Sequence, residues 1–564
     1  MRCKTLPAVG VAISLGLVTA TLTGSSQPVR ARHGMVVAHE RLATEAGRDV
    51  LRAGGSAVDS AVATAFVLAV THPTAGNIGG GGFMIVRPAT GEPVAYDFRE
   101  SAPAAASPAM FLVDGTYDRE LHHDGHVAVG VPGTVAGLHL AWSEHGRLPW
   151  SRLVRPAIEL AEDGFVATEH LARSLADVLP RMARYPASVE QFSRGGIPYE
   201  AGDIFRQPAL ADTLALIAEQ GPAGFYRGPT AQLIEREMQA NDGLITQVDL
   251  AGYRARRRDP LTGTYRGYEV ISMPPISSGG TALIQMLNTL EGYDLAASGH
   301  GSAQTVHVVA EAMRRAYADR ARFLGDPDFN PMMPIERLIS KPYADQLRHT
   351  IRGDRASTSS PTSFEWPVEG EETTHLSVVD ADRHAVSMTL TLEQGYGSRI
   401  VVPGAGFLLN NEMGDFNAGP GLTTAQGLIG TDPNLPAPGK RMLSSMTPTV
   451  VTRDGRLFML TGSPGGRTII NTVLQVITNV IDFGMNIQEA VDAPRFHHQW
   501  LPDRITYEQH GLSPDTVRLL EAKGHRLVQR NRQGVAQAIL YDAAADMLEG
   551  AADRRSVGST ALGY

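Results

Sequence analysis

Residues 371–375 contain two adjacent threonines, Thr373 and Thr374, directly before a strand-like run. A threonine hydroxyl is a weak nucleophile unless a base lies beside it, and one such base is the threonine's own α-amino group. That amine exists only if the chain is cut directly before the threonine. A cut between Glu372 and Thr373 would therefore convert a precursor into an enzyme with an N-terminal nucleophile. On this pentapeptide alone, ordinary strand composition is the more frequent explanation, because β-branched residues favour strands.

Two glycines, Gly465 and Gly466, follow Pro464 at a predicted junction between a strand and a helix. Glycines at such a junction can present backbone N–H groups at the N-terminus of the helix, where they would stabilise an oxyanion. A plain turn before the helix would need only one glycine. The pair therefore marks a candidate oxyanion site for acyl transfer.

The elements that would position these residues are hairpins flanked by helices. After Thr373 the pattern predicts strands at residues 374–379, 385–392, 449–452 and 457–461, followed by a helix at residues 468–483. Before Thr373 it predicts helices at residues 40–53 and 57–70, a hairpin over residues 83–96, a mainly helical stretch from 149 to 347, and a polar, flexible segment at residues 353–361. Sheets flanked by helices indicate an α/β or α+β architecture.

The composition is that of a soluble globular protein. The chain has 564 residues, of which 43% are hydrophobic and 19% charged, so it is long enough for a large core. A formal net charge of −9, without any dense run of Lys and Arg, argues against a nucleic-acid partner. The single cysteine is Cys3, so the mature protein would have no disulfide and no thiol chemistry.

The N-terminus is typical of a secretory signal. Arg2 and Lys4 precede an apolar stretch over residues 9–22, and small and polar residues follow up to Ala31. The stretch is short for a membrane span, although an uncleaved anchor is the alternative. We expect a signal peptide at residues 1–31 and a periplasmic or secreted protein without a membrane span after its removal.

Several motifs resemble those of the γ-glutamyltransferase family of N-terminal nucleophile hydrolases, and they occur in the family's order. Besides residues 373–380 around the candidate nucleophile, the matching stretches are residues 73–83, 97–100, 409–416, 443–446, 462–466 and 493–498. The resemblance spans nearly the whole chain after the predicted signal. Several motifs in order are far more specific than any single one.

This resemblance implies an α+β chain with a four-layer αββα N-terminal nucleophile hydrolase fold. It implies self-cleavage between Glu372 and Thr373, which would give a large subunit of residues 32–372 and a small subunit of residues 373–564. Thr373 would be the nucleophile, and the hydroxyl of Thr391 would support its amine. From the residues alone Thr374 stays open as the nucleophile, and only the resemblance favours Thr373.

The implied substrates are γ-glutamyl amides such as glutathione, with water, amino acids or peptides as acceptors. A γ-glutamyl group ends in an α-carboxylate and an α-ammonium, so its recognition needs opposite charges at a fixed distance. Arg99 suits the carboxylate through a two-pronged contact, and Ser444 and Ser445 can add hydrogen-bond donors. The acidic residues that suit the ammonium are Asp415, Glu412 and Glu393.

Two positions vary within the family. Glu393 stands where many members have Asn and others Glu, which leaves the ammonium site intact. Gln426 lies where some bacterial members have an aromatic residue of a lid, within a Pro- and Gly-rich stretch over residues 419–439. Without that aromatic residue the expectation of a tightly closing lid is weaker, and so is the expectation of efficient transfer to an acceptor.

We expect neither a cofactor nor a metal ion. Residues 79–82 lack the Gly-Lys-Ser/Thr ending of a phosphate-binding loop. The histidines at 122, 123 and 126 do not have the spacing of a standard zinc site, and their segment is predicted to be a solvated loop. His497 and His498 are predicted to be structural.

Two alternative functions follow from the same motifs. One is a related acylase that acts on glutaryl or cephalosporin substrates. A glutaryl group has no ammonium, so Asp415 would then be a buried charge without a partner, which is costly. The other alternative is a homologue that binds γ-glutamyl compounds but does not process itself.

Overall fold

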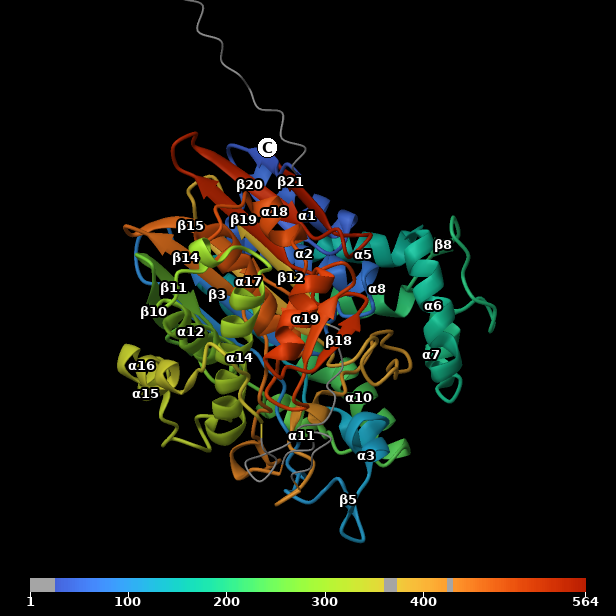
Figure 1. Cartoon of the computed structure of the whole chain (residues 1–564). Helices are drawn as coiled ribbons and strands as arrows, with labels where there is room; N and C mark the ends of the chain where they lie inside the picture. Colours follow the sequence, from blue (N-terminus) through green and yellow to red (C-terminus); the bar gives the residue numbers. More distant parts are fainter. Residues whose placement is uncertain (1–25, 360–372, 423–429) are drawn as a thin grey trace, which may run out of the picture.

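The structure is a computed structural model, which describes residues 26–359, 373–422 and 430–564. Most of the expected signal peptide, Glu372 at the expected cut and Gln426 in the expected lid lie outside the described residues. Two seven-stranded sheets form the centre of the molecule, and helices cover the outer face of each (Figure 1).

The first sheet contains the candidate nucleophile, and we call it the nucleophile sheet. In spatial order its strands are β21 (Thr560–Gly563), β2 (Met35–Ala38), β12 (Thr373–Val379), β13 (Ala385–Thr391), β3 (Gly81–Arg87), β4 (Val94–Asp97) and β9 (Arg256–Arg258). All neighbouring strands are antiparallel. Thr373 is the first residue of β12, so it lies at the end of a strand in the middle of the sheet.

The second sheet combines strands from both ends of the chain. In spatial order they are β1 (Val29–Ala31), β20 (Met547–Ala552), β19 (Gln537–Asp542), β15 (Arg456–Gly462), β14 (Thr449–Arg453), β11 (Tyr268–Ser272) and β10 (Leu261–Tyr265). β1 falls within the range predicted for the signal peptide, yet Val29 pairs with Gly550 and Ala31 with Leu548.

Three apolar layers separate these sheets and helices. The layer between the two sheets contains Phe83, Ile271 and Leu460. The nucleophile sheet packs on α1 (Arg41–Arg52), α2 (Ala57–Thr71) and α4 (Thr134–His145), whereas α5 (Trp150–Asp163) packs on α2 and α8 (Pro208–Gln220) packs on α5. The second sheet packs on α12 (Gly279–Leu290), α17 (Thr468–Ile481) and α18 (Ile487–Asp492), whereas α14 (Ala303–Phe323) packs on α12. The predicted four-layer αββα fold is therefore confirmed.

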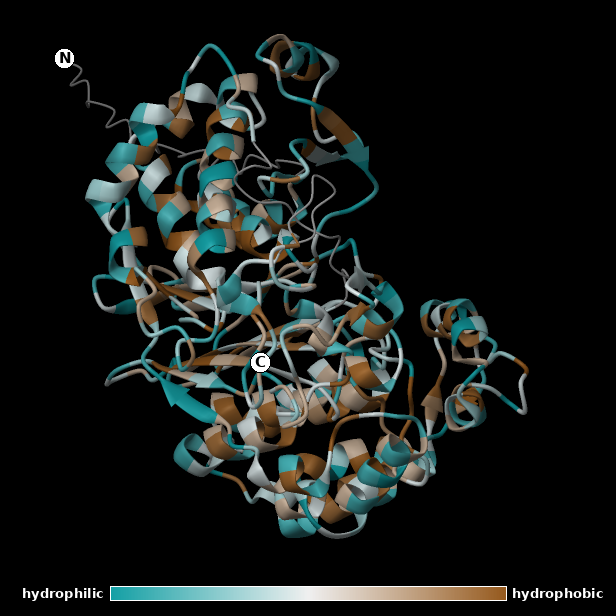
Figure 2. Cartoon of the chain, turned by 90° about the horizontal axis from the view of Figure 1, so that it is seen from below, coloured by the Kyte–Doolittle hydropathy of each residue, from teal (hydrophilic) through white to brown (hydrophobic). Residues whose placement is uncertain are grey.

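Burial patterns explain why the helices take these places. α2 begins at a capping box between Ser56 and Asp59, and all of its residues are buried because it lies beneath other helices. α1 instead buries one face, which includes Ala43, Val50 and Leu51. Figure 2 shows helices with both apolar and polar residues, as expected for elements with only one face against a sheet.

The alternation of side chains along β12 separates the two threonines. Leu376 and Val378 pack in the layer beneath the helices, whereas Val379 packs between the sheets. Since neighbouring side chains of a strand point to opposite faces, Thr373 lies on the face between the sheets and Thr374 on the helix face. The structure thus separates two residues that the sequence leaves equivalent.

The stretch from 149 to 347 is not as purely helical as predicted, because it also supplies β7 (Phe165–Val166), β8 (Ile204–Phe205) and β9 to β11. The short alternating runs of β10 and β11 extend the second sheet through β14. Its further helices are α6 (Glu169–Met182), α7 (Pro186–Phe192), α9 (Ala223–Tyr226), α10 (Gly228–Ala240), α11 (Gln247–Gly252), α13 (Leu295–Ser298), α15 (Ile335–Leu338) and α16 (Lys341–Thr350). α6 and α7 project from the body in Figure 1.

The remaining elements lie in connections around the sheets. They are β5 (Leu112–Val113), β6 (Thr116–Tyr117), α3 (Arg119–His123), η1 (His126–Ala128), η3 (Glu412–Asp415), η4 (Asp432–Asn434), β16 (Phe496–His497), β17 (Ile505–Glu508), α19 (Pro514–Ala522) and β18 (Leu527–Arg530). Across the described ranges, no helix combines the length and the apolar character needed to cross a bilayer.

Candidate active site

Thr373 and Thr391 face each other across the β12–β13 pair. They are register partners, and both are buried. Thr391 is held from two sides, because its Oγ1 accepts the amide hydrogen of Glu393 at 2.9 Å and its carbonyl accepts from Asn77 Nδ2 at 2.8 Å. A hydroxyl that already accepts one hydrogen bond keeps its own hydrogen available for a neighbour. Thr391 is therefore suited to orient a group at Thr373.

A small cavity of about 290 Å³ opens beside Thr373, and we call it the acyl cavity. It brings together every predicted site residue except Gly465, although these residues come from distant parts of the chain. Its lining is Arg99, Thr373, Thr391, Glu393, Glu412, Asp415, Ser444, Ser445, Met446, Gly466 and Ile469. Gly465 lines an adjoining cavity, which Thr373 also lines.

Gly465 and Gly466 form the turn that starts α17. Their φ angles are +128° and +51°, and a Cβ on Gly465 would lie 2.4 Å from Thr468 Oγ1. The carbonyl of Gly465 accepts from Thr468 N at 3.0 Å, and that of Gly466 accepts from Ile469 N at 3.2 Å. The left-handed backbone at both positions explains why the turn uses two glycines. The pair lies where a helix N-terminus favours negative charge, beside the candidate nucleophile.

Arg99 is fully buried, and carboxylates of the chain surround it. Its Nη1 donates to Glu412, its Nη2 to Asp415, and its Nε to the carbonyl of Met442 at 3.2 Å. Burial alone would lower its pKa, but the charges of Glu412 and Asp415 raise it. The two-pronged contact that we predicted for a substrate carboxylate is made here to two side chains of the protein.

Carboxyl groups outnumber guanidinium groups around Arg99. Glu100 Oε2 also lies 3.7 Å from its Nη1, and Glu393 lines the same cavity. Burial raises the pKa of Glu100 to about 7 against the lowering effect of Arg99. Burial likewise raises the pKa of Glu412 well above its ordinary value, and Glu100 and Asp415 add to this effect. A cation that entered the cavity would find carboxyl groups ready to ionise.

Glu393 is fixed by partners that the sequence did not indicate. Its φ is +78°, and its carboxylate accepts from Asn411 Nδ2, which also donates to the carbonyl of His123 at 2.9 Å. His123 Nδ1 lies 3.5 Å from Glu393 Oε1. The prediction of a solvated loop is therefore wrong, since His122, His123 and His126 are buried. Burial lowers the pKa of His122 well below its ordinary value, which keeps the ring neutral.

Arg320 of α14 supports the two serines from behind. Its Nη2 donates to Ser445 Oγ at 3.0 Å, and its Nε donates to Ser278 Oγ at 2.7 Å. Ser278 Oγ in turn donates to the carbonyl of Ser444 at 2.6 Å. Sequence reasoning missed Arg320, because nothing in α14 indicates that one of its several arginines turns towards the serines.

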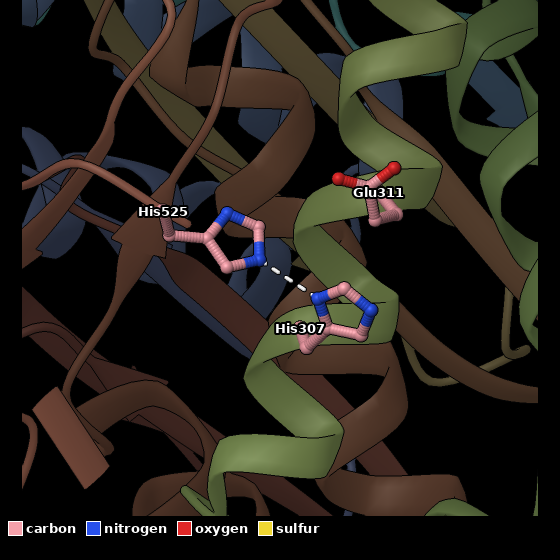
Figure 3. A group of neighbouring side chains, drawn as sticks. All are labelled: His307, Glu311 and His525. Carbon is pink, nitrogen blue, oxygen red and sulfur yellow. Dashed lines mark hydrogen bonds between the residues drawn. The ribbon is translucent and has the colours of Figure 1, made fainter. Parts of the chain in front are cut away.

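A buried group of two histidines and a glutamate lies outside this site (Figure 3). His307 Nδ1 and His525 Nε2 are 2.7 Å apart and share a hydrogen bond, and His307 Nε2 lies 2.7 Å from the carbonyl of Arg352. The Glu311 carboxylate is ion-paired with Arg314 at 3.2 Å and with Arg315 at 2.6 Å. Because two guanidinium groups pair with that carboxylate, the group is a structural network that ties α14 to the connection between α19 and β18.

Comparison with known proteins gives a consistent picture. The family model described as gamma-glutamyltranspeptidase matches residues 43–563. The chain is 48% identical to the glutathione hydrolase proenzyme of Escherichia coli (strain K12) over 545 residues, which cover 95% of this chain and 93% of that protein. It is 39% identical to the acylase ACY 1 proenzyme of Pseudomonas sp. (strain V22), with 93% and 92% covered. The crystal structure of cephalosporin acylase from Bacillus halodurans superposes with a TM-score of 0.86 at 28% identity, covering 98% of this chain and 99% of that chain.

Proposed function

This chain belongs to the gamma-glutamyltranspeptidase family, and from that membership we propose how it works. It is a proenzyme that cuts itself between Glu372 and Thr373. It then cleaves γ-glutamyl amides such as glutathione through an ester on Thr373, and passes the γ-glutamyl group to water or to amino acids and peptides. The observation that carries this proposal is the position of Thr373, which lines one small cavity together with Arg99 and Asp415.

The first step makes the catalyst. Thr373 Oγ attacks the carbonyl carbon of Glu372, the peptide bond shifts to an ester, and water hydrolyses that ester. The products are a carboxylate on Glu372 and a free α-amine on Thr373. A free α-amine has a pKa of about 7.7–8.0, so it can accept a proton near neutral pH.

The second step uses that amine as the base. It takes the hydroxyl proton while Thr373 Oγ attacks the γ-carbonyl carbon of the substrate. The amides of Gly465 and Gly466 stabilise the oxyanion, the C–N bond breaks, and the leaving amine takes the proton from the Thr373 ammonium. Water or an acceptor amine then attacks the ester and restores free Thr373. Thr391 orients the Thr373 amine, which its place opposite Thr373 supports.

The acyl cavity recognises the two charged ends of the glutamyl group. Arg99, with Ser444 and Ser445, binds the α-carboxylate, and the acidic residues Asp415, Glu412 and Glu393 bind the α-ammonium. Binding then exchanges partners, because the substrate carboxylate takes over Arg99 and the ammonium takes over Asp415. The excess of carboxyl groups around Arg99 supports this exchange.

The proposed cut also sets the boundaries of the two subunits, and a signal peptide precedes the large one. We propose a large subunit that ends at Glu372 and a small subunit of residues 373–564. The signal peptide ends before Val29, because β1 pairs with β20 in the folded body. The protein acts in the periplasm or outside the cell.

A denaturing gel with N-terminal sequencing tests the proposal together with a γ-glutamyl anilide assay. We expect two bands, of which the smaller begins Thr-Thr-His, and hydrolysis of the anilide. A single uncut chain without hydrolysis would instead identify a homologue that only binds its ligand.

The second candidate function is acylase activity on glutaryl side chains. It is favoured by the likeness to an acylase proenzyme and to a cephalosporin acylase structure. Against it stands the charge of the acyl cavity, because a glutaryl group brings no ammonium to offset Asp415, Glu412 and Glu393. The γ-glutamyl group is therefore the better match.

A further inference from the structure

Two larger cavities continue from Thr373. The first, of about 730 Å³, is lined by Thr373, Gly465 and Arg532 among others. The second, of about 650 Å³, is lined by Gly465, Arg532, Arg467, Arg504 and Arg530 among others. Because they share Gly465 and Arg532, we treat them as one space and call it the arginine channel. It begins at the candidate nucleophile and leads to a group of guanidinium groups.

The charged side chains among the described residues that line this channel are cationic. Among the described residues that line it there is no aspartate or glutamate. Within the described part of the chain, Arg504, Arg530 and Arg532 form no ion pair, whereas nearby Arg495 lies 2.7 Å from Asp553. Burial, together with the charges of Arg530 and Arg526, lowers the pKa of Arg504. In a chain with a net charge of −9, a cavity lined by several guanidinium groups and by no described carboxylate favours an anionic ligand.

The geometry of the proposed reaction directs the leaving amine of the substrate into this channel. Gly466 lines the acyl cavity and Gly465 lines the channel, so the reacting carbonyl sits at their boundary, beside Thr373. If the glutamyl group fills the acyl cavity, the leaving amine extends from the opposite side of the same carbon. An acceptor amine attacks along that path in reverse, because transfer is the reverse of acylation.

From this arrangement we propose that the arginine channel is the leaving-group and acceptor subsite, and that it selects peptides and amino acids with several carboxylates. Arg532 lines both cavities and binds the first carboxylate, next to the scissile bond. Arg504 and Arg530 line only the farther cavity and bind a second one. The inference rests on the proposed function, since it assumes acyl transfer at Thr373.

The chemical step stays balanced whichever amine is used. In acylation the C–N bond of the γ-glutamyl amide breaks, the C–Oγ bond forms, and the leaving amine gains one proton. In transfer to an acceptor the C–Oγ bond breaks, a new C–N bond forms, and a proton of the acceptor amine passes through the Thr373 amine to Thr373 Oγ, which restores the hydroxyl. The arginines take no part in bond making and act only by charge.

The test compares three γ-glutamyl donors whose leaving parts carry different charges. They are an anilide without carboxylate, γ-glutamylglycine with one carboxylate and γ-glutamylglutamate with two. The variants are Arg532→Gln and the double variant Arg504→Gln/Arg530→Gln. The control is Arg456→Gln, an exposed arginine at the far end of β15 from Gly462. Two bands on a denaturing gel show that each variant has folded and processed itself.

We expect wild type to have a higher kcat/KM for γ-glutamylglutamate than for γ-glutamylglycine, and this preference should shrink as salt is added. Arg532→Gln should lower kcat/KM for both acidic donors relative to the anilide by about fivefold, as expected for an exposed charge pair. The double variant should lower the ratio of γ-glutamylglutamate to γ-glutamylglycine, and Arg456→Gln should change neither ratio.

Two different failures can be told apart. Suppose that wild type cleaves the anilide but that the ratios of kcat/KM among the three donors are the same in wild type and both variants. The channel then does not recognise carboxylates, and this inference is overturned. If wild type cleaves no γ-glutamyl donor at all, the proposed function itself has failed.

Discussion

The acyl cavity and the arginine channel meet at Thr373 but recognise their ligands in different ways. The acyl cavity is small. Two of its carboxyl groups, Glu412 and Asp415, contact the buried Arg99, and a third, Glu393, accepts a hydrogen bond from Asn411. The channel is larger. Its Arg530 and Arg532 are exposed, its Arg504 is half-buried, and these three form no ion pair with the described residues. Fixed, buried partners suit a group that is the same in every turnover. Exposed charges suit a leaving group that varies between substrates, because they attract its carboxylates without requiring one shape of the leaving group.

Replacing Thr373 with alanine should have the largest effect, because both spaces depend on this one residue. The variant lacks the hydroxyl for self-cleavage and for acylation, so we expect one uncut chain and a loss of activity on the order of 10⁶-fold. A denaturing gel and an anilide assay measure both. Thr373→Ser keeps a hydroxyl and should still be cut, and an active, processed Thr373→Ala variant would contradict the assignment.

Replacing Gly465 with alanine should disturb the glycine turn at the boundary between the acyl cavity and the arginine channel. The new Cβ would strain the backbone at φ +128° and approach Thr468, which would displace the proposed oxyanion donor. We expect kcat to fall by about 10²–10³-fold for every donor, whatever its leaving group. Gly484→Ala is the matched control, because it has a φ of +64° but open space around it. Equal losses of kcat in the two variants would show that backbone strain alone causes the effect, and would contradict the oxyanion role of Gly465.

Replacing Asp415 with asparagine should affect the acyl cavity alone. It removes the proposed partner of the substrate ammonium, so we expect kcat/KM for a γ-glutamyl anilide to fall by about 30- to 100-fold, as for a lost charged hydrogen bond. A glutaryl anilide has no ammonium and should lose much less. The preference among leaving groups should stay the same. Asp432→Asn, in the nearby η4, is the control, and equal loss on both anilides would count against the role of Asp415.

Replacing Glu100 with glutamine should change the pH dependence of stability with little effect on the channel. Burial raises the pKa of Glu100 from its ordinary 4.5 to about 7. Between these values the folded protein holds a proton that the unfolded chain has lost, so the free energy of unfolding falls as pH rises through this window. In Glu100→Gln the free energy of unfolding should therefore decrease less over the same pH range, by on the order of 1–3 kcal/mol.

Thermal unfolding at pH 5 and pH 8 measures this effect. The Tm of wild type should drop more between the two pH values than the Tm of Glu100→Gln. Glu159→Gln, an exposed glutamate of α5, should behave like wild type. An unchanged drop in Glu100→Gln would show that other carboxyl groups, such as Glu412, carry the titration.

The local part of the site was predictable from the sequence, because neighbouring strands of a hairpin fix their own register. The sequence predicted strands at residues 374–379 and 385–392, and the structure pairs them so that Thr373 lies opposite Thr391. The two adjacent glycines likewise predicted a junction between a strand and a helix, and they lie between β15 and α17. Even the choice between Thr373 and Thr374 follows from the pleat once the buried faces of β12 are known.

The long-range part was not predictable from local pattern. Arg99 meets Glu412 and Asp415 only after the whole chain has folded, and only the family resemblance had grouped them. His123 looked like part of a polar loop, yet tertiary packing buries it beside Glu393. Arg530 and Arg532 are close in sequence, but Arg467 and Arg504 come from other segments, so no local run of charge indicated the channel. Their common cavity is a property of the fold alone.

The most direct test of the central claim is to trap the acyl-enzyme and locate it by mass spectrometry. The processed protein is mixed with a γ-glutamyl donor, quenched in acid, and digested. The account predicts a small subunit that begins at Thr373 and carries one glutamyl group as an ester on that residue. A glutamyl group on another residue, such as Thr391 or Ser444, or a small subunit with a different first residue, would contradict it.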